Sequence, residues 1–282
     1  MCKVGIIDIE PQIFNTAYMQ ISQYHKQKGD TVNWWSPLTD QQFDIVYCSS
    51  LFEFTDKREV PKRAICGGTG FDITSLLSKN MEACNYDYSL YPECDYSIVW
   101  FSRGCIRNCP FCVVRQKEGY INPVKPKQLN HKREYIAIQD NNFFASPDWR
   151  EAHKQLLEWG LPVSFSGGID IRLITKEQCD ALNSLKIHKQ IYIAWDNPKQ
   201  DLREHIKLLV DNVKPYKIAC YVLIGYWSTP EEDLYRVEEL RKFKIDPFAM
   251  PYNKKDPYQR AFARYVNHKA TFKIVKWEDY RG

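Results

Sequence analysis

The chain has 282 residues, of which 44% are hydrophobic and 26% charged, and its formal net charge is +4. This composition excludes a disordered or low-complexity protein, and the length is enough to bury a large core. The first ten residues hold one Lys and a short apolar stretch, too short for a signal peptide or a membrane span. We therefore expect a cytoplasmic protein with no membrane partner.

Residues 1–92 predict a small α/β domain. Hydrophobic periodicity indicates strands at 3–9, 31–35, 43–48 and 63–65, and a helix at 15–28 that Gly29 ends. Strands joined in this way are typical of a parallel sheet. We expect a Rossmann-like N-terminal domain over these residues.

Residues 93–250 continue the alternation with longer helices. We expect strands at 97–101, 135–139, 163–165, 190–194, 217–223 and 247–250, and helices at 149–159, 175–185, 202–213 and 231–242. Six such alternations predict a partial (β/α)6 TIM-type barrel, in which chemistry takes place at the carboxyl ends of the strands. Residues 251–282 predict a basic, helical C-terminal extension.

Three of the ten cysteines lie within eight residues, directly after the first expected barrel strand. Cys105, Cys109 and Cys112 have the spacing C-x3-C-x2-C, and such crowding in a reducing compartment favours metal binding over disulfides. Three thiolates on one loop can hold three corners of a [4Fe–4S] cluster and leave the fourth iron without a protein ligand. An open metal position indicates a site that binds something else.

This loop resembles the signature of the radical S-adenosylmethionine (SAM) superfamily, including the aromatic Phe111 directly before the third Cys. The resemblance implies two cofactors, a [4Fe–4S] cluster and SAM, with the amino and carboxylate groups of SAM on the open iron and Phe111 against the adenine. It implies reductive cleavage of SAM to methionine and a 5′-deoxyadenosyl radical, which abstracts hydrogen from a substrate. A reductase or flavodoxin-type protein is the expected electron donor.

Polar residues follow the second barrel strand, where family members place a motif that accepts hydrogen bonds from the SAM amino group. This motif is often Gly-Gly-Glu, and the chain departs from it with Asp140, Asn141 and Asn142. Their oxygens can accept from an ammonium group. An Asx cap on the following helix is the alternative interpretation.

Three more strand ends carry candidate SAM contacts. Arg172 resembles the Arg that binds the SAM carboxylate in related enzymes, with a surface Arg as the alternative. Gly167 and Gly168 allow a close backbone approach to a ligand, or a turn. The remaining candidates are Asp196 for the ribose hydroxyls, and Ile224 and Gly225 for the adenine.

The N-terminal domain resembles a degenerate form of the cobalamin-binding domain that precedes the barrel in one radical SAM subgroup. The Asp-x-His-x-x-Gly motif that ligates cobalt is absent, because Asp8-Ile9-Glu10 leads into Pro11, and we do not expect cobalamin. Methylthiotransferases carry a second cluster in a similar domain. Cys48 and Cys66 fall at comparable strand ends here, but the third Cys is missing, and we interpret both as core residues.

The alternative function is an iron–sulfur or zinc protein that carries metal or electrons without catalysis. Such a protein needs a fourth protein ligand, and no fourth Cys or His lies next to this loop in the sequence. Residues 1–104 carry a net charge of −4, from 9 bases and 13 acids, so the remainder carries +8. A basic second half favours a nucleic acid or nucleotide as the substrate, with a peptide second, although it is equally typical of a solvated face.

Overall fold

The computed structural model describes residues 1–281 and divides into two compact units. The first unit comprises Met1–Tyr96, Arg107–Gly119 and Pro126–Arg133, and the second comprises Ser97–Ile106, Tyr120–Lys125 and the chain from Glu134 onward. Both are mixed α/β structures with parallel sheets. The segments at 107–119 and 126–133, expected within the barrel, group with the N-terminal residues.

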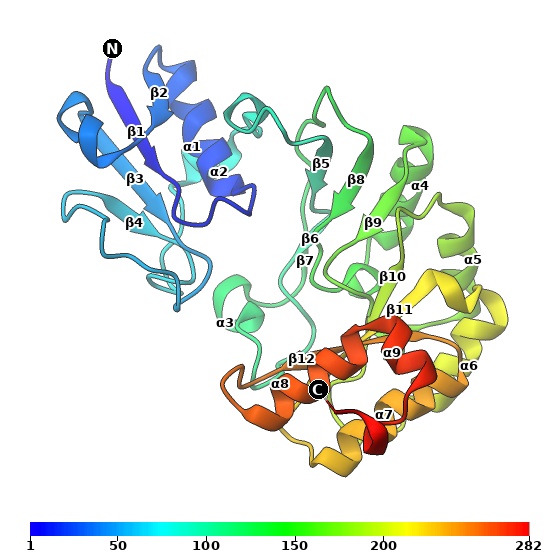
Figure 1. Cartoon of the computed structure of the whole chain (residues 1–282). Helices are drawn as coiled ribbons and strands as arrows, with labels where there is room; N and C mark the ends of the chain where they lie inside the picture. Colours follow the sequence, from blue (N-terminus) through cyan, green and yellow to red (C-terminus); the bar gives the residue numbers. More distant parts are fainter. Residues whose placement is uncertain (282) are drawn as a thin grey trace. The chain divides into compact units, whose positions relative to one another are not determined.

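The first unit is built on a four-stranded sheet with the order β2-β1-β3-β4 (Figure 1). Its strands are β1 (Lys3–Ile7), β2 (Thr31–Trp34), β3 (Ile45–Ser49) and β4 (Ile65–Gly67), and every neighbouring pair is parallel. The four expected strands are thus present, with ends displaced by at most two residues. Cys66 is exposed, so the interpretation of this residue as part of the core was wrong, because the edge strand β4 is only partly covered.

Helix α1 (Thr16–Gln27) packs on this sheet and ties the strand ends together. It begins at Asn15, whose side chain accepts a hydrogen bond from the Ala17 amide. The buried Tyr18 hydroxyl donates to the Ile7 carbonyl at 2.5 Å and accepts from the Ser49 amide at 2.6 Å. One helix side chain therefore fixes the carboxyl ends of β1 and β3. The short helices α2 (Lys79–Ala83) and α3 (Val114–Glu118) complete this unit.

The second unit has six principal strands in sequence order, in two adjoining sheets, β5-β8-β9 and β10-β11-β12. They are β5 (Tyr96–Val99), β8 (Tyr135–Ile138), β9 (Val163–Phe165), β10 (Ile191–Ala194), β11 (Ile218–Ile224) and β12 (Asp246–Pro251). A parallel bridge between Ile169 and Ile193 connects the two sheets. Within residues 1–281 no pairing of β5 with β12 is found, so no closed barrel is formed.

Four helices lie on one side of these strands, as expected from the sequence (Figure 1). They are α4 (Trp149–Trp159), α5 (Lys176–Ser184), α6 (Arg203–Asn212) and α7 (Pro230–Lys242). The start of α7 has a capping box, in which Thr229 and Glu232 satisfy each other's backbone amides. The core consists of the apolar residues that alternate along the strands, such as Ile191, Ile193 and Cys220, and the helix faces that cover them.

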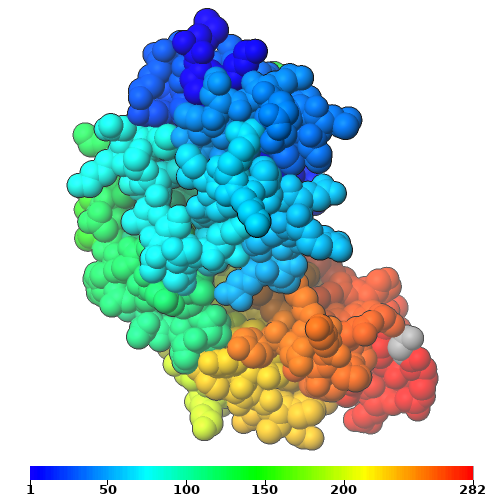
Figure 2. Space-filling model, turned by 90° about the vertical axis from the view of Figure 1, so that its left-hand side faces the viewer, coloured from blue at the N-terminus to red at the C-terminus, as the bar shows by residue number. Residues whose placement is uncertain are grey.

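The C-terminal segment contains two helices and a short 3-10 turn. It contains α8 (Pro257–Asn267) and α9 (Lys269–Ile274), and residues in the red part of the chain lie at the surface in Figure 2. Helix α8 packs on β12, and Lys269 binds Asp246 of that strand at 2.6 Å. Part of the basic character of this segment is therefore compensated within the fold. None of the helices in residues 1–281 is long and apolar enough to cross a membrane.

Candidate cluster loop and strand-end site

The cysteine loop starts and ends in a short antiparallel pair of strands. Strand β6 (Ser102–Arg103) follows β5, and β7 (Asn122–Pro123) pairs with it, with Ser102 opposite Pro123. Gly104 has a φ of +79°, a conformation that glycine adopts without strain, directly before Cys105. The pair β6–β7 therefore closes the loop, and the glycine turns the chain into it.

The three loop cysteines are accessible, whereas five of the other seven cysteines are buried. Cys105 and Cys109 are half-buried and Cys112 is exposed, and a turn joins the last two through a 2.9 Å bond from the Cys112 amide to the Cys109 carbonyl. Burial raises the pKa of Cys48 to about 12 and that of Cys94 to about 11, so these core thiols stay protonated. None of the ten cysteines forms a disulfide in the described chain.

Within residues 1–281 no three His, Cys, Asp or Glu side chains are gathered as a metal-binding group. Thiols that act as cluster ligands must be accessible to the metal, and the three thiols on this short loop lie outside the core.

Asp140 fixes the start of the cysteine loop. Its side chain is buried, with one oxygen accepting from the Phe101 amide at 2.8 Å and the other from the Ser102 hydroxyl at 2.5 Å. Burial raises the pKa of Asp140 to about 6, although these hydrogen bonds act in the opposite direction. The carboxylate thus links the end of β8 to β6, and in this structure it positions the loop.

Asn142, Asp170 and Arg172 come together at the ends of β8 and β9. Asn142 is 2% exposed, and its amide nitrogen donates to Asp170 Oδ2 at 3.4 Å, while its Oδ1 atom has no hydrogen-bond partner within residues 1–281. Asp170 also accepts from Arg172 Nε at 2.5 Å. A buried carbonyl oxygen without a donor is unusual, and it is suited to accept from an ammonium group of a ligand. Asn141 is half-buried beside it.

The two glycines after β9 serve the packing of neighbouring strand ends. A Cβ atom on Gly167 would lie 2.6 Å from the Asp140 carbonyl oxygen, and Gly168 has a φ of +80°. Gly167 is therefore required because the Asp140 backbone lies too close for a side chain. Gly168 is required because its backbone adopts a positive φ.

The candidates on β10 and β11 differ in accessibility. Asp196 is half-buried and accepts from the Leu223 amide at 3.3 Å, and burial raises its pKa. Ile224 is fully buried, so its side chain belongs to the core. Gly225 has a φ of +74°, and a Cβ atom there would lie 2.1 Å from the side chain of Gln259.

Sequence reasoning missed a buried cation that binds these strand ends. Arg236 of α7 is fully buried, and it donates to the carbonyls of Trp195 and Asp196 at 2.7 and 3.0 Å and to the Leu223 carbonyl at 3.0 Å. Asp233 pairs with it at 2.6 Å. The signal was an Asp-x-x-Arg pair on an amphipathic helix, a pattern that also occurs on solvated helix faces.

Aromatic rings cover the other face of β10–β12. Tyr192 stacks on Tyr221 with ring centroids 4.9 Å apart, and Phe248, 45% exposed, meets Tyr221 edge-on at 5.8 Å. Successive side chains of a strand point to opposite faces of the sheet, and the neighbours of these aromatic residues along each strand are buried against the helices. The rings therefore point to the face of the sheet away from the helices. The strand-end residues thus adjoin an aromatic sheet face.

No protein-family model matches the chain, and no curated protein is significantly similar to it.

Proposed function

We propose that this protein is a radical SAM enzyme that cleaves SAM reductively and abstracts hydrogen from a substrate. The observation that carries the proposal is the loop with Cys105, Cys109 and Cys112, whose thiols stand outside the core and whose start is held by the buried Asp140. A carrier protein would be expected to fill the fourth metal position with its own side chain. The sequence next to this loop offers none.

In this proposal the six strands of the second unit form a partial (β/α)6 barrel, and the first unit is a Rossmann-like domain. The sequential order of β5 and β8 to β12 supports it, as do the helices along one side of the strands. Chemistry in such sheets takes place at the carboxyl ends of the strands, where Asn142, Arg172 and Asp196 follow β8, β9 and β10.

The residues of the chain have distinct tasks in the proposed reaction. The three cysteines hold a [4Fe–4S] cluster, which supplies the electron that cleaves bound SAM. Asn142 Oδ1 accepts from an N–H of the SAM amino group, because it is a buried acceptor in need of a donor. Arg172 binds the SAM carboxylate, and Asp170 orients its guanidinium through the 2.5 Å contact. Asp140 keeps the loop in place and touches neither cofactor.

The decisive experiment measures 5′-deoxyadenosine after anaerobic cluster reconstitution, reduction with dithionite and addition of SAM. The parent protein is expected to form the nucleoside, and Cys109→Ala is expected to form none. Cys66→Ala is the matched control, because Cys66 is an exposed cysteine outside the loop. A protein with about four irons that forms no nucleoside and shows no SAM-induced change in the cluster EPR spectrum would refute the proposal.

Asn142 offers a second test that does not depend on turnover. Asn142→Ala removes an acceptor that has no partner among the described residues, so we expect SAM affinity to fall about tenfold, the size of one hydrogen bond to a charged group. Isothermal titration of the reconstituted protein with SAM measures the affinity. Asn183→Ala, at an exposed amide that binds the Asn212 carbonyl, is the control and should leave SAM binding unchanged.

A further inference from the structure

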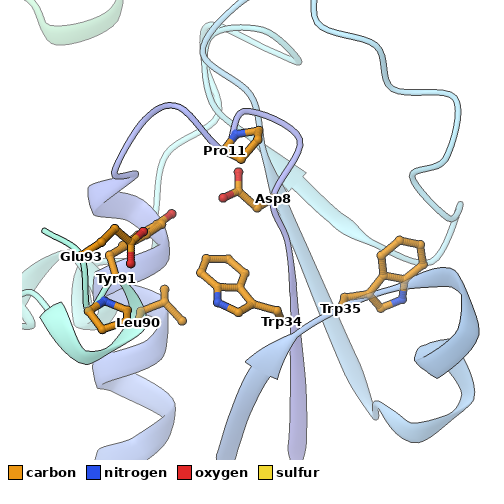
Figure 3. Close-up of a pocket in the computed structure, with 8 residues that line it drawn as sticks. Asp8, Pro11, Trp34, Trp35, Leu90, Tyr91 and Glu93 are labelled. Carbon is orange, nitrogen blue, oxygen red and sulfur yellow. The ribbon is translucent and has the colours of Figure 1, made fainter.

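A pocket of about 420 Å³ lies in the first unit, at the carboxyl edge of its parallel sheet (Figure 3). Its lining residues follow the ends of β1 and β2 or belong to the segment before β5: Asp8, Pro11, Trp34, Trp35, Leu90, Tyr91, Pro92 and Glu93. Strand β1 has β2 as its neighbour on one side and β3 on the other, so the order of the strands reverses at β1. In open parallel sheets, ligands bind at this edge, beside the strand where the order reverses.

Trp34 provides the accessible aromatic surface of the pocket. It ends β2, is 40% exposed, and packs with its ring centroid 5.3 Å from that of Tyr91. Tyr91 is buried, and its hydroxyl accepts from the Asn15 amide. Figure 3 shows the Trp34 ring between Asp8 and the segment of Glu93, whereas Trp35 points to the opposite side. The Trp34 indole thus packs against a fixed ring and remains partly exposed to solvent.

Two carboxylates flank this indole. Asp8 is half-buried, and its side chain accepts from the Glu10 amide at 3.1 Å. Burial raises the pKa of Asp8, and the nearby Glu10 and Glu93 act in the same direction. Among the described lining residues there is no Lys, Arg or His. The pocket therefore combines an aromatic wall with negative charge that its own lining does not balance.

This combination selects one class of ligand. A weakly hydrated organic cation gains from the face of an indole and from carboxylates together, because it loses little hydration when it leaves water. An anion would be repelled by both carboxylates, and a neutral apolar group would leave them without a partner. The volume accommodates a cationic head group and part of the chain that carries it.

We propose that this pocket is a binding site for an organic cation, a guanidinium or alkylated ammonium group, held by the Trp34 face and the Asp8 and Glu93 carboxylates. The site lies wholly within the first unit and does not depend on the proposed reaction. It gives that unit a task in recognition, the capture of a positively charged group.

Isothermal titration of the full-length protein with two pairs of probes tests this site. Nα-acetylargininamide is compared with its neutral analogue Nα-acetylcitrullinamide, and choline with the neutral 3,3-dimethylbutanol. We expect at least one cation to bind saturably and its neutral partner to bind at least about tenfold more weakly, since only the charge differs. The cation that binds more tightly identifies the head group.

Three single variants test whether the cation binds in this pocket. Glu93→Gln, at an exposed side chain, should weaken the bound cation about tenfold, and Trp34→Leu should do the same through the lost ring. Glu59→Gln changes the net charge equally at an exposed carboxylate outside the pocket and should have no effect. Circular dichroism confirms that each variant is folded. Absence of saturable binding by both cations, or an equal effect of Glu93→Gln and Glu59→Gln, would overturn the proposal.

Discussion

At the scale of single residues, the buried carboxylates serve the architecture of the strand ends. Asp140 uses both oxygens to hold Phe101 and Ser102, and Asp170 holds Arg172. A carboxylate with such fixed donors orients the segment that supplies them. In the proposed site the cysteines and Asn142 bind the cofactors. Asp140 and Asp170 position these residues and take no part in the reaction.

The raised pKa of Asp140 predicts a pH-dependent stability. Because its pKa rises from 3.8 to about 6 on folding, the native state holds the proton more tightly, and stability falls as pH rises between these values. Asp140→Asn abolishes this loss, so its stability relative to the parent should rise by roughly 2 kcal/mol from pH 4 to pH 7, somewhat less than the full shift of about two pKa units because the unfolded carboxyl is already partly ionised at pH 4.

Urea unfolding at both pH values measures this difference. The absolute stability of the variant is less informative, because its amide group also alters the hydrogen bonds to Phe101 and Ser102 at every pH. Asp148→Asn, at an exposed carboxyl of the neighbouring segment, controls for the change in net charge. A pH-independent difference between Asp140→Asn and the parent would contradict the assignment of the raised pKa.

At the scale of elements, the junction after β11 depends on a glycine. Gly225→Ala introduces a Cβ atom 2.1 Å from the buried Gln259 side chain at a φ of +74°. The backbone conformation alone costs an alanine about 1–2 kcal/mol, and the overlap with a packed side chain adds roughly 1–3 kcal/mol. Thermal unfolding should therefore show a loss of about 2–5 kcal/mol.

Two further variants separate the two causes. Gly160→Ala, at a φ of +65° with no atom nearer than 4.0 Å, should show the backbone cost alone. The double variant Gly225→Ala/Gln259→Ala should be less destabilised than the sum of the two single variants, because the overlap is gone. Additive effects would mean that Gln259 moves aside without cost.

The sequence predicted most elements well because their periodic apolar residues are local signals. Strands β8 to β11 and helices α4 to α7 lie within one or two residues of the expected ranges. The contacts of the candidate site were not predictable in the same way. Asp140 bonds to residues 38 and 39 positions away, and Arg236 to Trp195 across 41 positions. Partners at such separations depend on which strand ends become neighbours, and no local pattern encodes that.

At the scale of the whole molecule, the second unit is held at its strand ends by a buried ion pair. Arg236→Met leaves Asp233 without its cation and three carbonyl groups without their donor. We expect a loss of about 3–5 kcal/mol in the free energy of unfolding. Arg203→Met breaks an exposed pair with Asp201 and should cost at most about 1 kcal/mol.

Chemical denaturation of the two variants side by side provides the measurement. The double variant Arg236→Met/Asp233→Asn should recover part of the loss, since no buried charge is left unpaired. Equal losses for Arg236→Met and Arg203→Met would show that the strand ends are held by their backbone hydrogen bonds alone.

The hydrogen bonds of Arg236 also determine how α7 and the ends of β10 and β11 unfold locally. Helix α7 and the ends of β10 and β11 share one set of hydrogen bonds, so none of the three can unfold locally without breaking the bonds of the others. In hydrogen–deuterium exchange, the amides of α7, Trp195 and Leu223 should therefore open with one common free energy, as a single cooperative unit. Arg236→Met should lower that value for all of them together and leave the amides of β1 and β3 unchanged.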